Sequence, residues 1–134
     1  MRRGPKPSRD GQWAAHFFAA AQLVVRGYRV APVTDAESPL AVESPSGAAF
    51  TVVVHGILRE NGAWIVRQAP VHTPALYVAV LAVPSPGHPR YFVLSADEVA
   101  AALRTVTPQP KGSLGNYRMR DVLDHEDRWE KLPS

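Results

Sequence analysis

The stretch LAVESPSGAAFTVVVHGIL, from Leu40 to Leu58, predicts two strands joined by a tight turn. Leu40–Glu43 is the first strand, and Ser44–Gly47 has the Ser, Pro and Gly residues typical of a turn. The second strand, Ala49–Leu58, is an almost continuous apolar run, which favours a central strand buried on both faces. The hairpin therefore places a sheet at the centre of the fold.

Helical and extended patterns alternate on both sides of this hairpin. A helix is predicted from Trp13 to Arg26, with its apolar stripe packed on the sheet and Gly27 as its stop; the stripe is Trp13, Phe17, Ala20 and Val24. A second helix follows Ser95, which forms a capping box with Glu98. Further strands are expected at Tyr28–Val33, Ala63–Gln68, Ala75–Val83 and Tyr91–Leu94. This order predicts an α/β fold, a mixed central β-sheet flanked by helices.

The chain divides into three parts by composition. Residues 1–11, with two prolines, two glycines and four cations, are expected to form a flexible basic arm. Residues 12–106 form the predicted α/β domain. Residues 107–134 are expected to be an irregular linker, Thr107–Asn116, followed by a tail that docks through Trp129 and Leu132.

Bulk composition limits the class of protein. The 134 residues are 46% hydrophobic and contain no cysteine, which indicates a globular domain without disulfides or thiolate chemistry. No apolar run approaches the roughly 20 residues of a membrane-spanning helix. We therefore expect a cytoplasmic protein with no membrane partner.

Positive charge is concentrated at the start of the chain. The formal net charge is +3, but four cations precede Asp10, and without them 11 basic residues face 12 acidic ones. Such an arm can bind phosphates. The candidate nucleic-acid contacts are these four residues and two arginines that flank Met119, namely Arg2, Arg3, Lys6, Arg9, Arg118 and Arg120.

Several short sequence motifs, taken in their order along the chain, resemble the PD-(D/E)XK nuclease-like superfamily. The resemblance is to its restriction-endonuclease-like and Holliday-junction-resolvase-like branches. The first helix ends in Arg26-Gly27-Tyr28, and the hairpin contains VESPSG, Val42–Gly47. Later come Pro89, Tyr91 and Val93, and then the DRWEKL tail from Asp127 to Leu132. The resemblance covers about Gln12 to Leu132 and implies a restriction-endonuclease-like core. It also implies carboxylates that hold Mg²⁺ and a lysine beside them.

Those chemical positions hold other residues in this chain. Aligned on VESPSG, the strand acid falls on Pro39, and the (D/E)-x-K triplet falls on Val53-Val54-His55. The glutamate of the first helix falls on His16. Valine offers no metal ligand, and a histidine is mostly neutral at pH 7. The resemblance thus indicates a nuclease frame without its catalytic residues and without a metal site.

The leading interpretation is a catalytically inactive binding or scaffolding module that uses no cofactor. Nucleic acid is its first expected partner, and another protein or a second copy is the second. One alternative is an active Mg²⁺-dependent nuclease whose ligands have moved, with Asp35, Glu37 and Glu43 as the displaced carboxylates. Another is an assembly module that pairs through a sheet edge or through the exposed face of the ALYVAVLAV region, Ala75–Val83. The sequence leaves these alternatives open.

Overall fold

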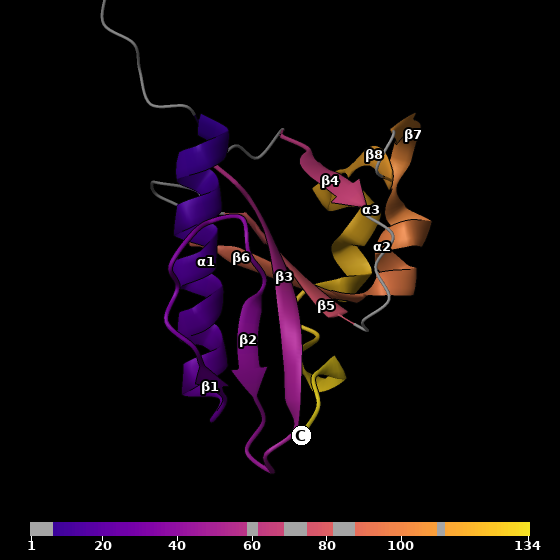
Figure 1. Ribbon diagram of the computed structural model, residues 1–134. Helices are drawn as coiled ribbons and strands as arrows, with labels where there is room; N and C mark the ends of the chain where they lie inside the picture. The colour runs from indigo at the N-terminus through magenta and orange to yellow at the C-terminus, as the bar shows by residue number, and fades with distance from the viewer. Residues whose placement is uncertain (1–6, 59–61, 69–74, 82–87, 110–111) are drawn as a thin grey trace, which may run out of the picture.

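The computed structural model describes residues 7–58, 62–68, 75–81, 88–109 and 112–134. Within these ranges, helices and short 3₁₀ turns (η) lie before, between and after the strands (Figure 1). The elements are α1 (Pro7–Val25), β1 (Arg29–Val30), β2 (Leu40–Glu43), β3 (Ala49–Ile57), β4 (Trp64–Gln68), β5 (Ala75–Leu81), β6 (Arg90–Ser95), α2 (Ala96–Ala102), β7 (Arg104–Gln109), β8 (Gly112–Tyr117), α3 (Met119–Val122), η1 (Leu123–His125) and η2 (Trp129–Lys131).

The hairpin from Leu40 organises a mixed five-stranded sheet, in the order β1-β2-β3-β5-β6. β2 pairs antiparallel with β3, and Leu40 lies opposite Val52. β3 then pairs parallel with β5, and β5 pairs antiparallel with β6. The turn is closed where Ser44 N–H donates to Ala48 O (2.8 Å), while Gly47 adopts the positive φ of 94° that favours glycine. The predicted α/β class and central hairpin are confirmed.

A second sheet, in the order β4-β8-β7, corrects the expected irregular linker. Thr107–Asn116 falls largely within β7 and β8, which form an antiparallel hairpin. β8 also pairs antiparallel with β4. Prolines and glycines in this segment favoured a loop, but β4 supplies a neighbouring edge whose backbone hydrogen bonds outweigh that local preference.

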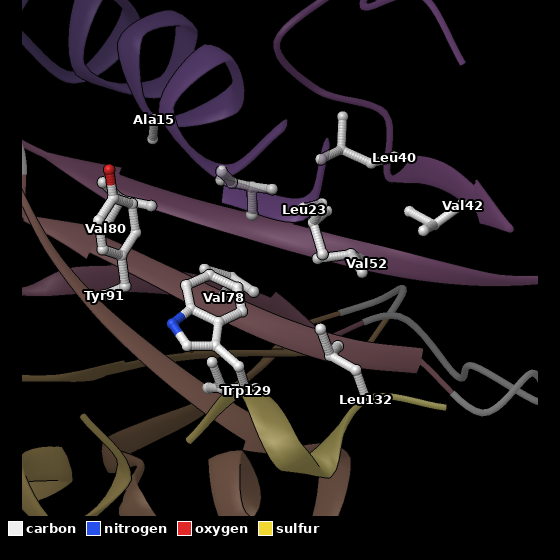
Figure 2. Packing of buried hydrophobic residues seen from close by; sticks show 13 residues of the cluster. Ala15, Leu23, Leu40, Val42, Val52, Val78, Val80, Tyr91, Trp129 and Leu132 are labelled. Atoms are coloured by element: carbon white, nitrogen blue, oxygen red, sulfur yellow. The ribbon is translucent and has the colours of Figure 1, made fainter. Parts of the chain in front are cut away.

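The two faces of the five-stranded sheet support separate cores. Val52, Val54, Val78 and Val80 are buried on one face, together with residues of α1 and of the tail (Figure 2). The other face packs against the second sheet, α2 and α3; its core includes Tyr77, Phe92, Trp64 and Tyr117. In Figure 1, α1 lies on one side of β3, and β4, β7 and β8 lie on the other.

The inner face of α1 differs from the predicted stripe. Ala15, Ala19 and Leu23 are fully buried against the sheet, whereas Phe17 and Val24 are 57% and 55% exposed. The prediction that Phe17 and Val24 pack on the sheet was therefore wrong. Both sides of this helix are apolar, so periodicity alone could not choose between them, and the small side chains allow the closer approach.

Helix α1 also begins earlier than expected. It starts at Pro7, so residues 7–11, including Arg9, belong to a helix and not to a flexible arm. Proline is favoured at the first helical position, where its missing N–H leaves no bond unmade. Residues 1–6, with Arg2, Arg3 and Lys6, lie outside the described ranges.

The second helix and the C-terminal tail match the sequence analysis. Ser95 N–H donates to Glu98 Oε1 (2.8 Å), and Glu98 N–H donates to Ser95 Oγ (3.2 Å), which completes the capping box. Trp129 and Leu132 of the tail are buried in the core that α1 covers (Figure 2). In the described part of the chain, no helix is both long and apolar enough to cross a membrane.

Candidate functional site

A cleft of about 590 Å³ opens where the first turns of α1 pass the end of β3. Its walls come from four separate segments of the chain: Gln12 of α1, Ala36 and Glu37 of the loop before β2, Val53–Ile57 of β3, and Ala63–Ile65 at β4. It therefore contains two of the positions, Val53 and His55, to which the nuclease resemblance assigns the catalytic triplet.

Gln12 joins α1 to β3 at the floor of this cleft. Its side-chain amide donates to Val54 O and accepts from Gly56 N–H at 2.9 Å. β2 ends its pairing with β3 at Val52, so these backbone groups lie beyond the last residue pair of the hairpin. The amide of Gln12 thus replaces the neighbouring strand for one residue pair, which satisfies backbone groups that would otherwise be exposed or unpaired.

The glycine at position 56 allows α1 to approach β3 closely at this point. A Cβ at Gly56 would lie 2.3 Å from Ala15 Cβ and 2.5 Å from Gly11 O. No side chain larger than hydrogen fits there without a shift of the helix. The crossing of α1 over β3 therefore depends on Gly56 as much as on Gln12.

The side chain of His55 contacts the second sheet through Tyr117. Its Nδ1 lies 2.8 Å from the hydroxyl of Tyr117 on β8, and its ring contacts those of Tyr77 and Tyr117. Burial, helped by the nearby His16 ring, lowers the pKa of His55 to about 4. The imidazole is therefore neutral at pH 7.

The bond to Tyr117 also fixes which nitrogen of His55 carries the hydrogen. The Tyr117 hydroxyl is fully buried, burial raises its pKa well above the ordinary value, and Nδ1 is its bonding partner in the described residues. Tyr117 therefore donates to Nδ1, and the hydrogen of the neutral ring is on Nε2. Nε2 has no hydrogen-bond partner within those residues, and His55 is one of the side chains that line the cleft.

His16 lies one helical turn beyond Gln12 and is 1% exposed. Its Nδ1 is 2.8 Å from Gln12 O, and its Nε2 is 3.1 Å from Ser38 O. Carbonyl oxygens only accept hydrogen bonds, so each ring nitrogen bonds its carbonyl when it carries a hydrogen. The ring fastens the loop before β2 to α1.

The three displaced-carboxylate candidates do not converge. The Asp35 carboxylate accepts from Glu37 N–H, Ser38 N–H and the Ser38 hydroxyl at 2.7–2.9 Å, and these bonds lower its pKa. Glu37 lines the cleft. Glu43 is exposed at the other end of β2, opposite Ala49, and Pro39 is exposed at the start of that strand. No group of three or more His, Cys, Asp or Glu side chains suited to a metal ion occurs in the described ranges.

The basic candidates fall into two separate places. Arg9 lies on α1 one turn before Gln12, whereas Arg2, Arg3 and Lys6 lie outside the described ranges. Arg118 and Arg120 are exposed near the second sheet, next to Asp121, which forms an ion pair with Arg104. The structure therefore does not join these two arginines to the cleft.

Three residues of the site were not identified from the sequence: Gln12, Gly56 and Tyr117. The glycine was the one available signal, since a lone glycine inside an apolar strand indicates a close backbone approach. Gln12 and Tyr117 act through tertiary contacts, which leave no local pattern.

Comparisons of the chain with family models, with curated proteins and with solved structures give no match. The described geometry is therefore the basis for a functional hypothesis.

Proposed function

We propose that this chain is a non-catalytic nucleic-acid-binding module with a restriction-endonuclease-like core. One observation carries the proposal: two polar side chains in and beside the cleft, Gln12 and Asp35, are already bonded within the protein. Gln12 is bonded to β3, and Asp35 to its own loop. A carboxylate that accepts three internal hydrogen bonds has little capacity left for a metal ion.

The surroundings of His16 support the non-catalytic part of the proposal. The resemblance assigns a metal-binding glutamate to the position of His16, and the imidazole there lies 2.8 Å and 3.1 Å from two carbonyl oxygens of the protein. Both ring nitrogens face partners inside the protein, so the ring is not placed as a metal ligand. The Nε2–H of His55 adds a fixed donor that can bond a phosphate or a base oxygen.

Charge placement favours nucleic acid over a neutral ligand. Four of the 15 cations lie in the first nine residues, and the last of them, Arg9, belongs to the helix whose Gln12 lines the cleft. Along the sequence, the highest density of positive charge is therefore within a few residues of the cleft, and cations of this kind can bind backbone phosphates.

The binding test measures affinity for a short duplex and a short single strand over a range of salt concentrations. The matched variant replaces Arg2, Arg3 and Lys6 with glutamine and leaves α1 intact. With about 0.9 units of log-log salt slope per duplex contact, we expect the slope to flatten by roughly two to three units. An Arg118→Gln, Arg120→Gln variant is the control and should bind as the parent does. No binding by the intact chain at low salt would contradict the proposal.

The alternative nuclease has one specific observation in its favour, because Glu37 lines the same cleft as His55. The test is incubation of the intact chain with plasmid, single-stranded DNA and RNA in Mg²⁺ and in Mn²⁺. We expect no cleavage. Cleavage that disappears in Glu37→Gln protein but persists in Glu43→Gln protein would contradict the non-catalytic proposal and favour the active nuclease.

A further inference from the structure

The outer face of α1 is apolar and uncovered. Four large side chains on it are exposed: Phe17 by 57%, Phe18 by 39%, Val24 by 55% and Val25 by 75%. Ala21 is exposed between them, and Trp13 stacks on Phe17 with ring centroids 5.8 Å apart. A helix that covers one face of a sheet normally carries charged or polar residues on its outer side.

Charge is absent from this helix over most of its length. From Gly11 to Val25 the sequence contains no Asp, Glu, Lys or Arg. Nucleic acid and acidic peptides are held through cations, so neither fits this surface. The surface fits an apolar partner.

The order of side chains along the outer face makes it complementary to itself. Bulky rings occupy its N-terminal half, at Trp13, Phe17 and Phe18, and smaller residues occupy its C-terminal half, at Ala21, Val24 and Val25. When two such helices pack antiparallel about a two-fold axis, the rings of each lie against the small residues of the other. An isologous contact of this kind is the commonest basis of homodimers.

The area is large enough for a dimer of modest affinity. With about 150–250 Å² for a fully buried Phe, the four exposed side chains offer on the order of 400 Å², which is already a large patch for a monomer. Two copies would bury about 800 Å² from these side chains alone, and Trp13, Ala14 and Ala21 would bring the total near the roughly 1,000 Å² of a specific interface.

We propose that the outer face of α1 is a homodimer interface, in which α1 packs antiparallel against α1 of a second copy. Gln12 lies at the N-terminal end of this helix, so the pair would carry its two clefts at opposite ends of the interface. This inference rests on the apolar face alone and does not depend on nucleic-acid binding.

The first test is the mass of the intact chain by light scattering, at concentrations up to about 200 µM, because interfaces of this size bind weakly to moderately. We expect twice the monomer mass of 14.6 kDa at the upper end. Phe17→Glu should weaken the dimer by at least about tenfold while the circular dichroism spectrum stays unchanged, since this side chain is outside the core. Leu123→Glu, at a side chain 50% exposed in η1, is the control and should dimerise normally.

The second test determines the relative orientation of the two α1 helices by disulfide cross-linking, which is possible because the chain has no native cysteine. In an antiparallel pair centred near Ala19, position 14 of one copy lies opposite position 24 of the other. Ala14→Cys and Val24→Cys copies, mixed and oxidised, should therefore cross-link to each other in preference to themselves. Monomer at every concentration, or equal loss of dimer in the Leu123→Glu and Phe17→Glu variants, would overturn the proposal. Preferential self-linking of each cysteine variant would overturn the antiparallel arrangement.

Discussion

The inner face of α1 carries mostly small side chains together with the polar Gln12 and His16, whereas its outer face is apolar and bulky. The inner face meets the sheet with Ala15, Ala19 and Leu23, while the outer face exposes Phe17 and Val24. The helix can lie close to β3 because the side chains at their crossing, Ala15 and Gly56, are small. Close packing, and not greater hydrophobicity, selects the buried side of this helix.

Leu23 and Val24 are adjacent residues on opposite faces, so they test this comparison directly. Leu23→Ala removes a fully buried side chain and should lower the free energy of unfolding by about 2–5 kcal/mol. Val24→Ala, at a side chain 55% exposed, should change it by about 0.5 kcal/mol or less under conditions where the chain is monomeric. Urea unfolding of both variants measures the difference. Equal losses would show that the outer face is also covered within one chain.

His55 lies on the face of the sheet that α1 does not cover, and its protonation opposes folding. Its pKa falls from 6.5 to about 4 on folding, so the unfolded chain binds more protons between these values. The free energy of unfolding should therefore have its full value above about pH 6.5 and decrease as the pH falls toward 4. We expect a decrease on the order of 2 kcal/mol, which is less than the full pKa shift would give, because solvent screens a half-buried ring.

Urea unfolding between pH 4.5 and 7 measures this effect, and His55→Gln is the matched variant because its amide oxygen can still accept from Tyr117. The carboxylates with lowered pKa, Asp35, Glu98, Asp121 and Glu126, titrate below this window and are common to both proteins. The same pH dependence in both proteins would assign the effect to a group other than His55.

Gln12 is a polar residue on the inner face of α1, and its replacement should lower the free energy of unfolding by less than the Leu23 substitution does. Gln12→Ala removes two hydrogen bonds and leaves Val54 O and Gly56 N–H without their partner, which should cost about 1–2 kcal/mol. Glu130, whose side chain accepts from Arg128 on exposed surface, is the control: Glu130→Ala should cost about 0.5 kcal/mol or less. Thermal unfolding compares the two. A negligible loss in Gln12→Ala would mean that water replaces the amide at the edge of β3.

Several features followed from local sequence patterns alone. The hairpin at Ser44–Gly47, the capping box of Ser95 and Glu98, and the burial of Val52, Val54, Val78 and Val80 were predicted and are confirmed. Each depends on turn chemistry, capping or an apolar run, which act over a few residues. The α/β class follows from their order.

Other features were decided only by tertiary structure. β7 and β8 formed in a segment with loop-like composition because β4 offered an edge to pair with. The buried side of α1 was set by the fit of Ala15 against Gly56, and the state of His55 by Tyr117, a residue 62 positions away along the chain. Sequence patterns report local preference and polarity, whereas fit, pairing and shared hydrogen bonds depend on which segments meet in space.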